Sequence, residues 1–153
     1  MTFETIQLDE FFIIGISVRT INQNGQSQKD IAGLWVRFMQ ENIMDIIPDK
    51  ITNEIYCIYT DYSNDFNGGY TTLLGCKVFS IHNVPERFTG KTISAGNYQL
   101  FLSTGKIPDS VVATWEYIWS SKTERKYLAD FDVYGIKAHE MDSAEVKTYV
   151  SVK

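Results

Sequence analysis

The order of strand-like and helical segments is the feature of this sequence that most limits its possible folds. Two runs rich in β-branched and aromatic residues, 3–8 and 11–20, precede an amphipathic segment that begins at Ser27, whose hydroxyl we expect to cap a helix. Two further runs, 54–60 and 70–80, flank the turn sequence NDFNGG, which predicts a hairpin. The first half of the chain is therefore predicted to be strand, strand, helix, strand, strand.

The second half of the sequence repeats this order. Segments 88–93 and 98–103 are expected to form a strand pair around Ala95-Gly96-Asn97. Pro108 opens a second amphipathic segment and suits the first turn of a helix. The last predicted strands are 129–138 and 146–152. Repetition of this kind indicates duplicated units with related packing.

These elements predict an α+β fold made of two duplicated ββαββ units, in halves of about 1–82 and 86–153. Both helices should pack on one face of a single antiparallel sheet, because each has one apolar stripe to bury. A ligand groove is then expected between the two pseudo-twofold halves, on the concave face of the sheet opposite the helices. The length of 153 residues and the hydrophobic share of 44% are typical of a single domain, 1–153, that buries a core without metal or disulfide support.

The charge balance and the cysteine content exclude several classes of protein. The formal net charge of −5 repels a phosphate backbone, so direct binding to nucleic acid is not expected. No apolar run approaches the roughly 20 residues that span a bilayer, so no membrane association is expected either. Cys57 and Cys76 are the only cysteines, and Met1 to Asp9 lacks the pattern of a secretory signal. A cytoplasmic location is therefore expected.

Aromatic residues make up 14% of the sequence, and tyrosines in particular favour partly wet sites such as ligand grooves. Alternation along a strand places Asp132 and Tyr134 on one face and Phe131 and Val133 on the other. If the apolar pair meets the helices, the carboxylate and the phenol face the groove, where they suit a cationic ligand. The alternative is that Asp132 is exposed or pairs with a nearby Lys or Arg.

Residue patterns that support catalysis or metal binding are mostly missing. His82 and His139 both lie in loop-like sequence, and neither has metal-ligand spacing to a cysteine. No phosphate-binding loop, dinucleotide fingerprint or serine nucleophile motif is present. The sequence therefore predicts no catalytic residues, no metal and no cofactor, and it leaves open whether the protein is an enzyme.

Several segments, by their order and spacing, resemble the GyrI-like family, the effector-binding domain of bacterial transcription activators that also occurs as a freestanding protein. The segments are 55–62 (IYCIYTDY), 69–78 (GYTTLLGCKV), 93–98 (ISAGNY), 115–119 (WEYIW), 125–134 (RKYLADFDVY) and the carboxy-terminal VKTYVSVK. The resemblance covers nearly the whole chain. It implies a groove that binds lipophilic, often cationic compounds, as in drug sensors and resistance proteins.

In this family the corresponding motif is usually Asp-Phe-Glu-x-Tyr, and its glutamate meets the ligand in the groove. The present sequence has Asp132 at that position, and its side chain is one methylene shorter. The resemblance implies that the ligand-binding residues are Asp132, Tyr134, Tyr149, Tyr59 and Trp115.

The sequence leaves three functions open. The first is sensing or sequestration of a lipophilic, possibly cationic small molecule. The second follows from freestanding relatives that hydrolyse strained cyclopropane-containing natural products, with Asp132 as general base. The third is inhibition of a protein partner through the acidic residues Glu140, Asp142 and Glu145. Because Phe3 already begins a strand, we expect no DNA-binding domain before it, and the protein could be a monomer or a dimer.

Overall fold

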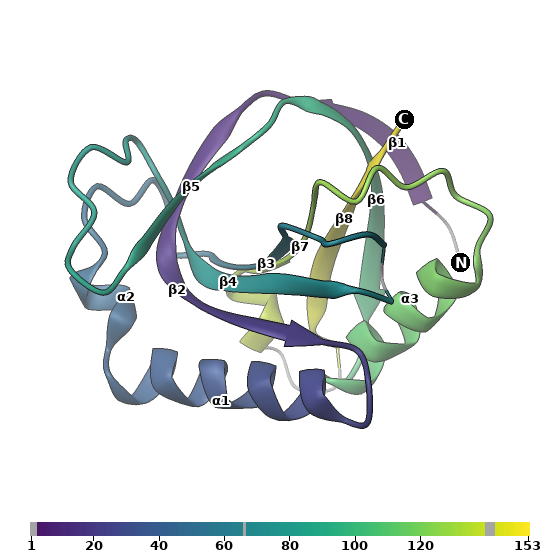
Figure 1. Ribbon diagram of the computed structural model, residues 1–153, viewed down its shortest axis with the longest axis horizontal. Coiled ribbons are helices and arrows are strands. Elements are labelled where there is room, and N and C mark those ends of the chain that lie inside the picture. The colour runs from purple at the N-terminus through teal and green to yellow at the C-terminus, as the bar shows by residue number, and fades with distance from the viewer. Residues whose placement is uncertain (1–2, 66, 140–142) are drawn as a thin grey trace.

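The computed structural model describes residues 3–65, 67–139 and 143–153, which form one antiparallel sheet and its covering helices (Figure 1). The strands are β1 (Phe3–Leu8), β2 (Phe11–Ile21), β3 (Ile55–Thr60), β4 (Gly69–Val78), β5 (Thr89–Ile93), β6 (Gly96–Thr104), β7 (Ala129–Tyr134) and β8 (Glu145–Val152). The helices are α1 (Gln26–Gln40), α2 (Ile43–Ile46), α3 (Asp109–Ser120) and the 3-10 helix η1 (Ile136–His139). The strands lie in the order β1-β6-β8-β7-β3-β4-β2-β5, which confirms the predicted α+β class.

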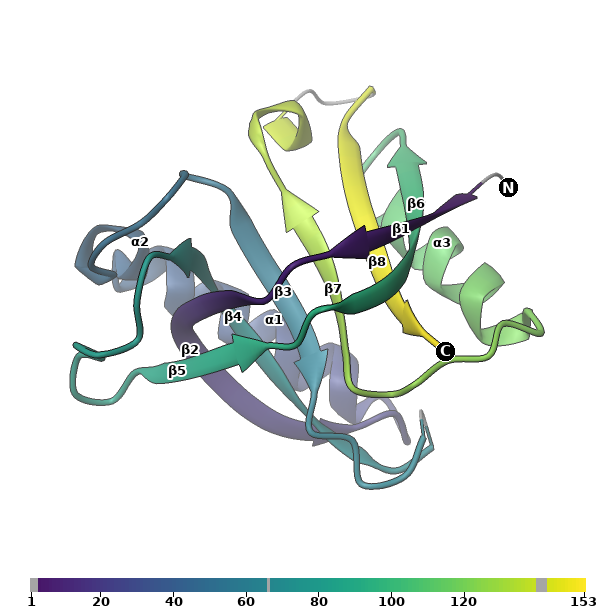
Figure 2. The ribbon, with the colours of Figure 1, turned by 90° about the horizontal axis from the view of Figure 1, so that it is seen from above.

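The sheet is strongly curved, and its two ends meet. β1 continues into β2 through Asp9 and Glu10, and β5 continues into β6 through Ser94 and Ala95. β1 pairs with β6 and β2 pairs with β5, in one antiparallel register that runs through both connections. Figure 2 shows these two bent segments lying side by side across the sheet.

The predicted strand pair of 88–93 with 98–103 is wrong, although both strands exist. The segment Ala95-Gly96-Asn97 is not a hairpin turn, because β6 begins at Gly96 and continues in the direction of β5. Each of these strands pairs instead with the amino-terminal segment 3–15. That partner is far away in the sequence, so local turn residues could not reveal the pairing.

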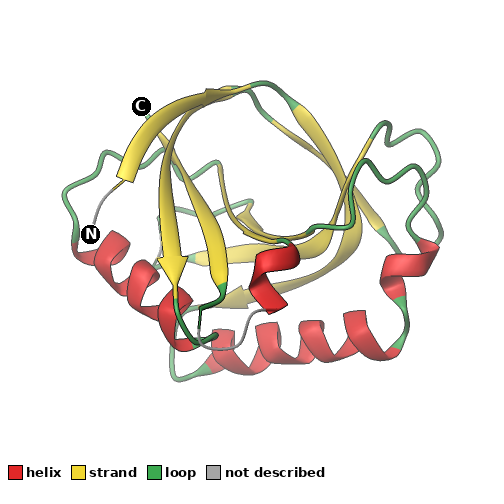
Figure 3. Cartoon of the chain, turned by 180° about the vertical axis from the view of Figure 1, so that it is seen from behind, coloured by secondary structure: helices red, strands yellow, loops and turns green. Residues whose placement is uncertain are grey.

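The two long helices lie on the same face of the sheet, as predicted (Figure 3). α1 packs on β2 and β4, whereas α3 packs on β6. The central strands β3 and β7 pair with each other between these two regions. The fold therefore leaves a gap between the helices over the middle of the sheet.

Apolar side chains cover both faces of the sheet, which we name the helix face and the inner face. Asp132 and Tyr134 lie on the helix face, and Phe131 and Val133 lie on the inner face within a second apolar cluster that includes Ile58. The predicted alternation is correct, but the expectation that the apolar pair meets the helices is wrong. A curved sheet buries apolar residues on its concave side as well, so apolarity did not identify the helix face.

The starts of the helices and the end of one strand differ from the prediction. The residue before α1 is Gly25, with a φ of 74°, and Ser27 lies inside the helix without capping it. A left-handed backbone at this point favours glycine over serine. Pro108 precedes α3 as its N-cap, and β7 ends at Tyr134 before the 3-10 helix. Within the residues described, no helix is long and apolar enough to cross a membrane.

The strands β2 and β4 approach most closely where Gly15 faces Gly75. A Cβ atom at Gly15 would overlap main-chain atoms of Leu74 and Gly75, so we expect Gly15→Ala to lower the free energy of unfolding by about 1–3 kcal/mol. Gly33, on the exposed side of α1, has no atom within 4 Å of the place that a Cβ methyl group would occupy, and it is the matched control. Gly33→Ala should raise stability by about 0.5–1 kcal/mol. Urea unfolding measures the free energy of unfolding of both variants. Equal changes in Gly15→Ala and Gly33→Ala would contradict the close approach of β2 and β4 at Gly15.

Candidate ligand-binding site

A groove lies on the helix face between α1 and the start of α3, whereas the sequence placed it on the opposite, concave face. It contains a cavity of about 920 Å³, within the range of pockets that hold organic ligands. Most of its walls are apolar or aromatic side chains. The lining residues are Trp35, Met39, Thr52, Asn53, Glu54, Ile55, Ile107, Pro108, Tyr134, Gly135, Ala138 and His139.

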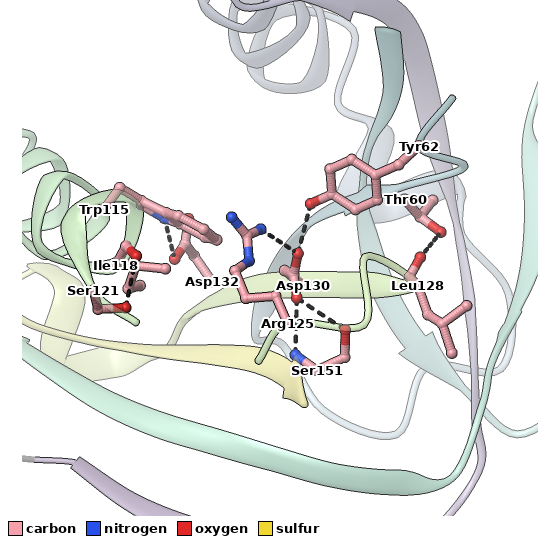
Figure 4. A network of polar contacts seen from close by, with 10 residues as sticks. All are labelled: Thr60, Tyr62, Trp115, Ile118, Ser121, Arg125, Leu128, Asp130, Asp132 and Ser151. Atoms are coloured by element: carbon pink, nitrogen blue, oxygen red, sulfur yellow. Dashed lines mark hydrogen bonds and ion pairs between the residues drawn. The ribbon is translucent and has the colours of Figure 1, made fainter. Parts of the chain in front are cut away.

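Asp132 lies on β7, two residues before Tyr134 of the groove wall, and is fully buried. Its carboxyl oxygens accept hydrogen bonds from Thr148 Oγ1 at 2.5 Å, from Trp115 Nε1 at 3.1 and 3.2 Å, and from the Tyr59 hydroxyl at 3.1 Å. Figure 4 shows the indole of Trp115 directed at this carboxyl group. Because all three partners can donate, the arrangement suits a deprotonated carboxylate.

The charge of Asp132 has no counter-ion among the described residues, whose ion pairs involve other side chains. Burial raises the pKa of Asp132 from 3.8 to about 6, while the hydrogen bonds from Thr148, Trp115 and Tyr59 lower it. At pH 7 the carboxyl group is therefore mostly charged. The alternative that Asp132 is exposed or paired with a Lys or Arg is wrong, and its buried negative charge lies two residues from Tyr134 of the groove wall.

Aromatic rings surround this carboxylate and connect the two helices. Trp35 on α1 makes an edge contact with Tyr134, with ring centroids 5.0 Å apart. Trp115 on α3 makes a similar contact with Tyr59 at 5.3 Å. Both tyrosines are partly buried and belong to the apolar clusters under both helices. Burial raises the pKa of each phenol, so Tyr59 and Tyr134 remain protonated.

A second buried carboxylate, Asp130, lies two residues earlier on the same strand (Figure 4). It forms an ion pair with Arg125 at 2.8 Å and accepts a hydrogen bond of 2.6 Å from the Tyr62 hydroxyl. The amide and hydroxyl groups of Ser151 donate to it at 2.8 and 3.1 Å. The Arg125 guanidinium also stacks on Tyr127, at 4.4 Å from its ring centroid. Asp130 is thus neutralised within the protein, unlike Asp132.

The structure brings together four of the five residues predicted to bind ligand. Asp132, Tyr59 and Trp115 are in direct contact, and Tyr134 lies next to them in the wall of the groove. Tyr149 lies on the inner face, stacked on Phe131 with ring centroids 4.8 Å apart. Alternation along β8 explains this, because its neighbour Thr148 is the residue that faces Asp132.

Several residues of the groove were not identified from the sequence. Thr148, which contacts Asp132, was not identified either, because this contact depends on the pairing of β7 with β8. Trp35 could have been found from its apolar helix stripe, whereas Ile107 and Pro108 come from a loop without a local signal. Of the acidic segment proposed to bind a protein, Glu140 and Asp142 lie outside the described residues, and Glu145 begins β8. The described part of the chain contains no group of three His, Cys, Asp or Glu able to hold a metal.

Solved structures of other proteins share this fold. An integron cassette protein from the mobile metagenome of Vibrio cholerae has a TM-score of 0.77 and 23% identity, covering 99% of this chain and 95% of its own. The structure of SAV2435 bound to tetraphenylphosphonium has a TM-score of 0.81 and 19% identity, covering 100% of this chain and 94% of its own. At these identities the similarity establishes the fold.

Similarity in sequence gives a more specific assignment. The candidate transcriptional regulator YobU of Bacillus subtilis is 26% identical over 144 residues, covering 91% of this chain and 90% of its own length. The family profile of Cass2, the integron-associated effector binding protein, matches residues 4–152. This range includes every strand and helix of the groove, and it agrees with the GyrI-like resemblance of the sequence motifs. The chain therefore belongs to the Cass2 family of integron-associated effector-binding proteins, which are GyrI-like domains.

Proposed function

We propose that this protein binds a lipophilic organic cation in the groove between α1 and α3, as a sensor or a sequestering protein. The observation that carries the proposal is the buried carboxylate of Asp132, which has three hydrogen-bond donors but no counter-ion among the described residues. Buried charges are normally paired, because an isolated charge is costly to remove from water. A cation in the groove would supply the missing positive charge.

The walls of the groove favour a ligand that is lipophilic as well as cationic. Trp35, Ile55, Ile107 and Tyr134 offer apolar and aromatic surface that inorganic cations do not need. A delocalised organic cation loses less hydration than a metal ion, and it is attracted to the faces of aromatic rings. Because Asp132 is fully buried, water screens its charge less than it would screen the charge of an exposed carboxylate.

The comparisons support this class of ligand. The family is described as effector-binding, and SAV2435, which shares the fold over the whole of this chain, was solved with tetraphenylphosphonium. That ligand is a lipophilic cation of the kind that the groove of this protein would accept. The name of YobU supports a link to transcription regulation, and the buried thiols of Cys57 and Cys76 suit a cytoplasmic protein.

Tetraphenylphosphonium is the probe that tests the proposal. We expect it to quench the fluorescence of Trp35 and Trp115 and to raise the melting temperature of the wild-type protein. Asp132→Asn should weaken its binding by about tenfold or more, because the isosteric side chain keeps the shape but removes the charge. Lowering the pH from 7 to 5 should weaken binding to the wild type, since Asp132 has a pKa of about 6 and becomes protonated.

Two controls separate charge from shape. Triphenylphosphine oxide is neutral and of similar bulk, so its weaker binding should be the same for the wild type and for Asp132→Asn. Glu116→Gln removes an exposed carboxylate from the outer side of α3 and should leave the affinity for tetraphenylphosphonium unchanged. Equal affinity of the wild type and Asp132→Asn for the cation, or no binding to either, would rule the proposal out.

A further inference from the structure

A second cavity opens on the inner face, on the opposite side of the sheet from the groove. Its volume is about 440 Å³, at the lower end of the range for small-molecule pockets. It lies beside the connection between β1 and β2, next to the inner apolar cluster. We name it the mouth pocket. Its lining residues are Gln7, Leu8, Asp9, Glu10, Phe11, Glu54, Tyr56, Lys77, Phe131, Val133, Lys147 and Tyr149.

The floor of the mouth pocket is aromatic. Phe131 lies at its centre, with the ring of Phe11 at 5.4 Å, the ring of Tyr56 at 5.9 Å and the ring of Tyr149 stacked at 4.8 Å. Val133 completes this surface. A flat apolar group can pack against the edges and faces of these aromatic rings. Tyr149, which does not line the groove, is part of this aromatic floor.

Charged side chains of both signs surround this floor. Asp9, Glu10 and Lys147 are exposed, so water screens their charges. Glu54 and Lys77 are only partly exposed, and they come two residues beyond the paired Tyr56 and Gly75 on the adjacent strands β3 and β4. A carboxylate and an ammonium group thus come from directly opposed positions of adjacent strands, and both residues line the pocket.

Glu54 and Lys77 do not neutralise each other. In the described ranges, the ion pairs within 4.0 Å involve neither residue. The Lys77 ammonium group lies instead over the ring of Phe11, at 5.2 Å from its centroid. Glu54 accepts a hydrogen bond from the Thr52 hydroxyl at 3.3 Å. Both charges remain available to a ligand that rests on the aromatic floor.

We infer that the mouth pocket is a second ligand site, for a small zwitterion with an aromatic body, such as an aromatic amino acid. The ammonium group of the ligand would meet Glu54, its carboxylate would meet Lys77, and its ring would rest against Phe131 and Tyr149. A ligand with one charge would leave either Glu54 or Lys77 desolvated without a partner, which disfavours it. The inference does not depend on cation binding in the groove, because the two cavities lie on opposite faces of the sheet.

Three matched probes test the charge requirement: L-phenylalanine, 2-phenylethylamine, which lacks the carboxylate, and 3-phenylpropionate, which lacks the amine. We expect calorimetric titration to give the tightest binding for L-phenylalanine, by about tenfold over either analogue. Lys77→Met should weaken the binding of L-phenylalanine by about tenfold and strengthen that of 2-phenylethylamine, which then no longer leaves an ammonium group without a partner. Lys122→Met, which removes an exposed lysine elsewhere, should alter neither.

Parallel measurements locate the site and check the fold of the variants. Because Glu54 also lines the groove, Lys77→Met is the decisive variant, and its unchanged response to tetraphenylphosphonium would show an intact fold if the groove binds that cation. If the groove does not bind that cation, the far-ultraviolet circular dichroism spectrum and the melting temperature of Lys77→Met show whether its fold is intact. Equal binding of the three probes, no binding of L-phenylalanine, or full affinity in Lys77→Met would each overturn the inference. Displacement of L-phenylalanine by tetraphenylphosphonium would also overturn it.

Discussion

Replacing Arg125 with methionine is expected to lower the free energy of unfolding by about 3–5 kcal/mol, the usual cost of removing one partner from a buried ion pair. The variant leaves Asp130 fully buried, with hydrogen bonds from Tyr62 and Ser151 but without its counter-ion. The loss is a large part of the 5–15 kcal/mol typical of a domain. Urea unfolding followed by circular dichroism measures it.

The exposed ion pair of Lys91 with Asp61 provides the matched control. Its atoms are as close as those of the buried pair, 2.7 Å against 2.8 Å, but its side chains are 31% and 52% exposed. Lys91→Met should therefore lower stability by only about 0–1 kcal/mol. The double variant Arg125→Met, Asp130→Asn should recover part of the loss, because it leaves no unpaired charge. A loss in Arg125→Met as small as that in Lys91→Met would contradict this account.

The second large effect is a pH dependence that comes from Asp132. Its pKa is about 6 in the folded protein and near 3.8 when unfolded, so between these values the folded state binds more protons. The contribution of Asp132 to stability should therefore rise by about 2 kcal/mol as the pH falls from 7 to 4. Asp132→Asn cannot titrate. Relative to the wild type, the variant should gain about 2 kcal/mol between pH 4 and pH 7.

This difference between variant and wild type is the quantity to measure, because the titration of all other groups cancels in it. Urea unfolding at pH 4, 5, 6 and 7 gives the difference directly. Thr148→Val should make the dependence steeper, since it removes a hydrogen bond that lowers the pKa of Asp132. A difference that stays constant over this range, or that changes in the opposite direction, would show that folding does not raise the pKa of Asp132.

The parts of the fold that depend on local sequence were predictable. The hairpin of β3 and β4 follows from its turn residues, and the two long helices follow from their apolar stripes. Alternation also placed Asp132 and Tyr134 on one face, and the family resemblance added Trp115 and Tyr59. These four residues meet in the structure because paired residues of adjacent strands point to the same face of the sheet, and α3 packs on that face.

The parts that were missed depend on contacts between distant residues. Alternation tells which side chains share a face, but both faces of this sheet carry apolar clusters, so it could not tell which face the helices cover. The partners Arg125 and Ser151 of Asp130 come together only through the pairing of strands in the second half. Tyr149 was assigned to the groove from the resemblance, although the face it occupies follows from its position next to Thr148.

The pairing of β1 with β6 also bears on how the chain is made. Phe3 leaves the ribosome well before Phe101, its partner in the sheet, whereas β2 can pair with β4 before β5 is synthesised. The hairpin of β3 and β4 can form during synthesis, but β1 stays unpaired until β6 has emerged. Pairing of residues so far apart in sequence is intrinsically slow. During translation, β1 precedes the other strands of this sheet but is among the last of them to find its partner.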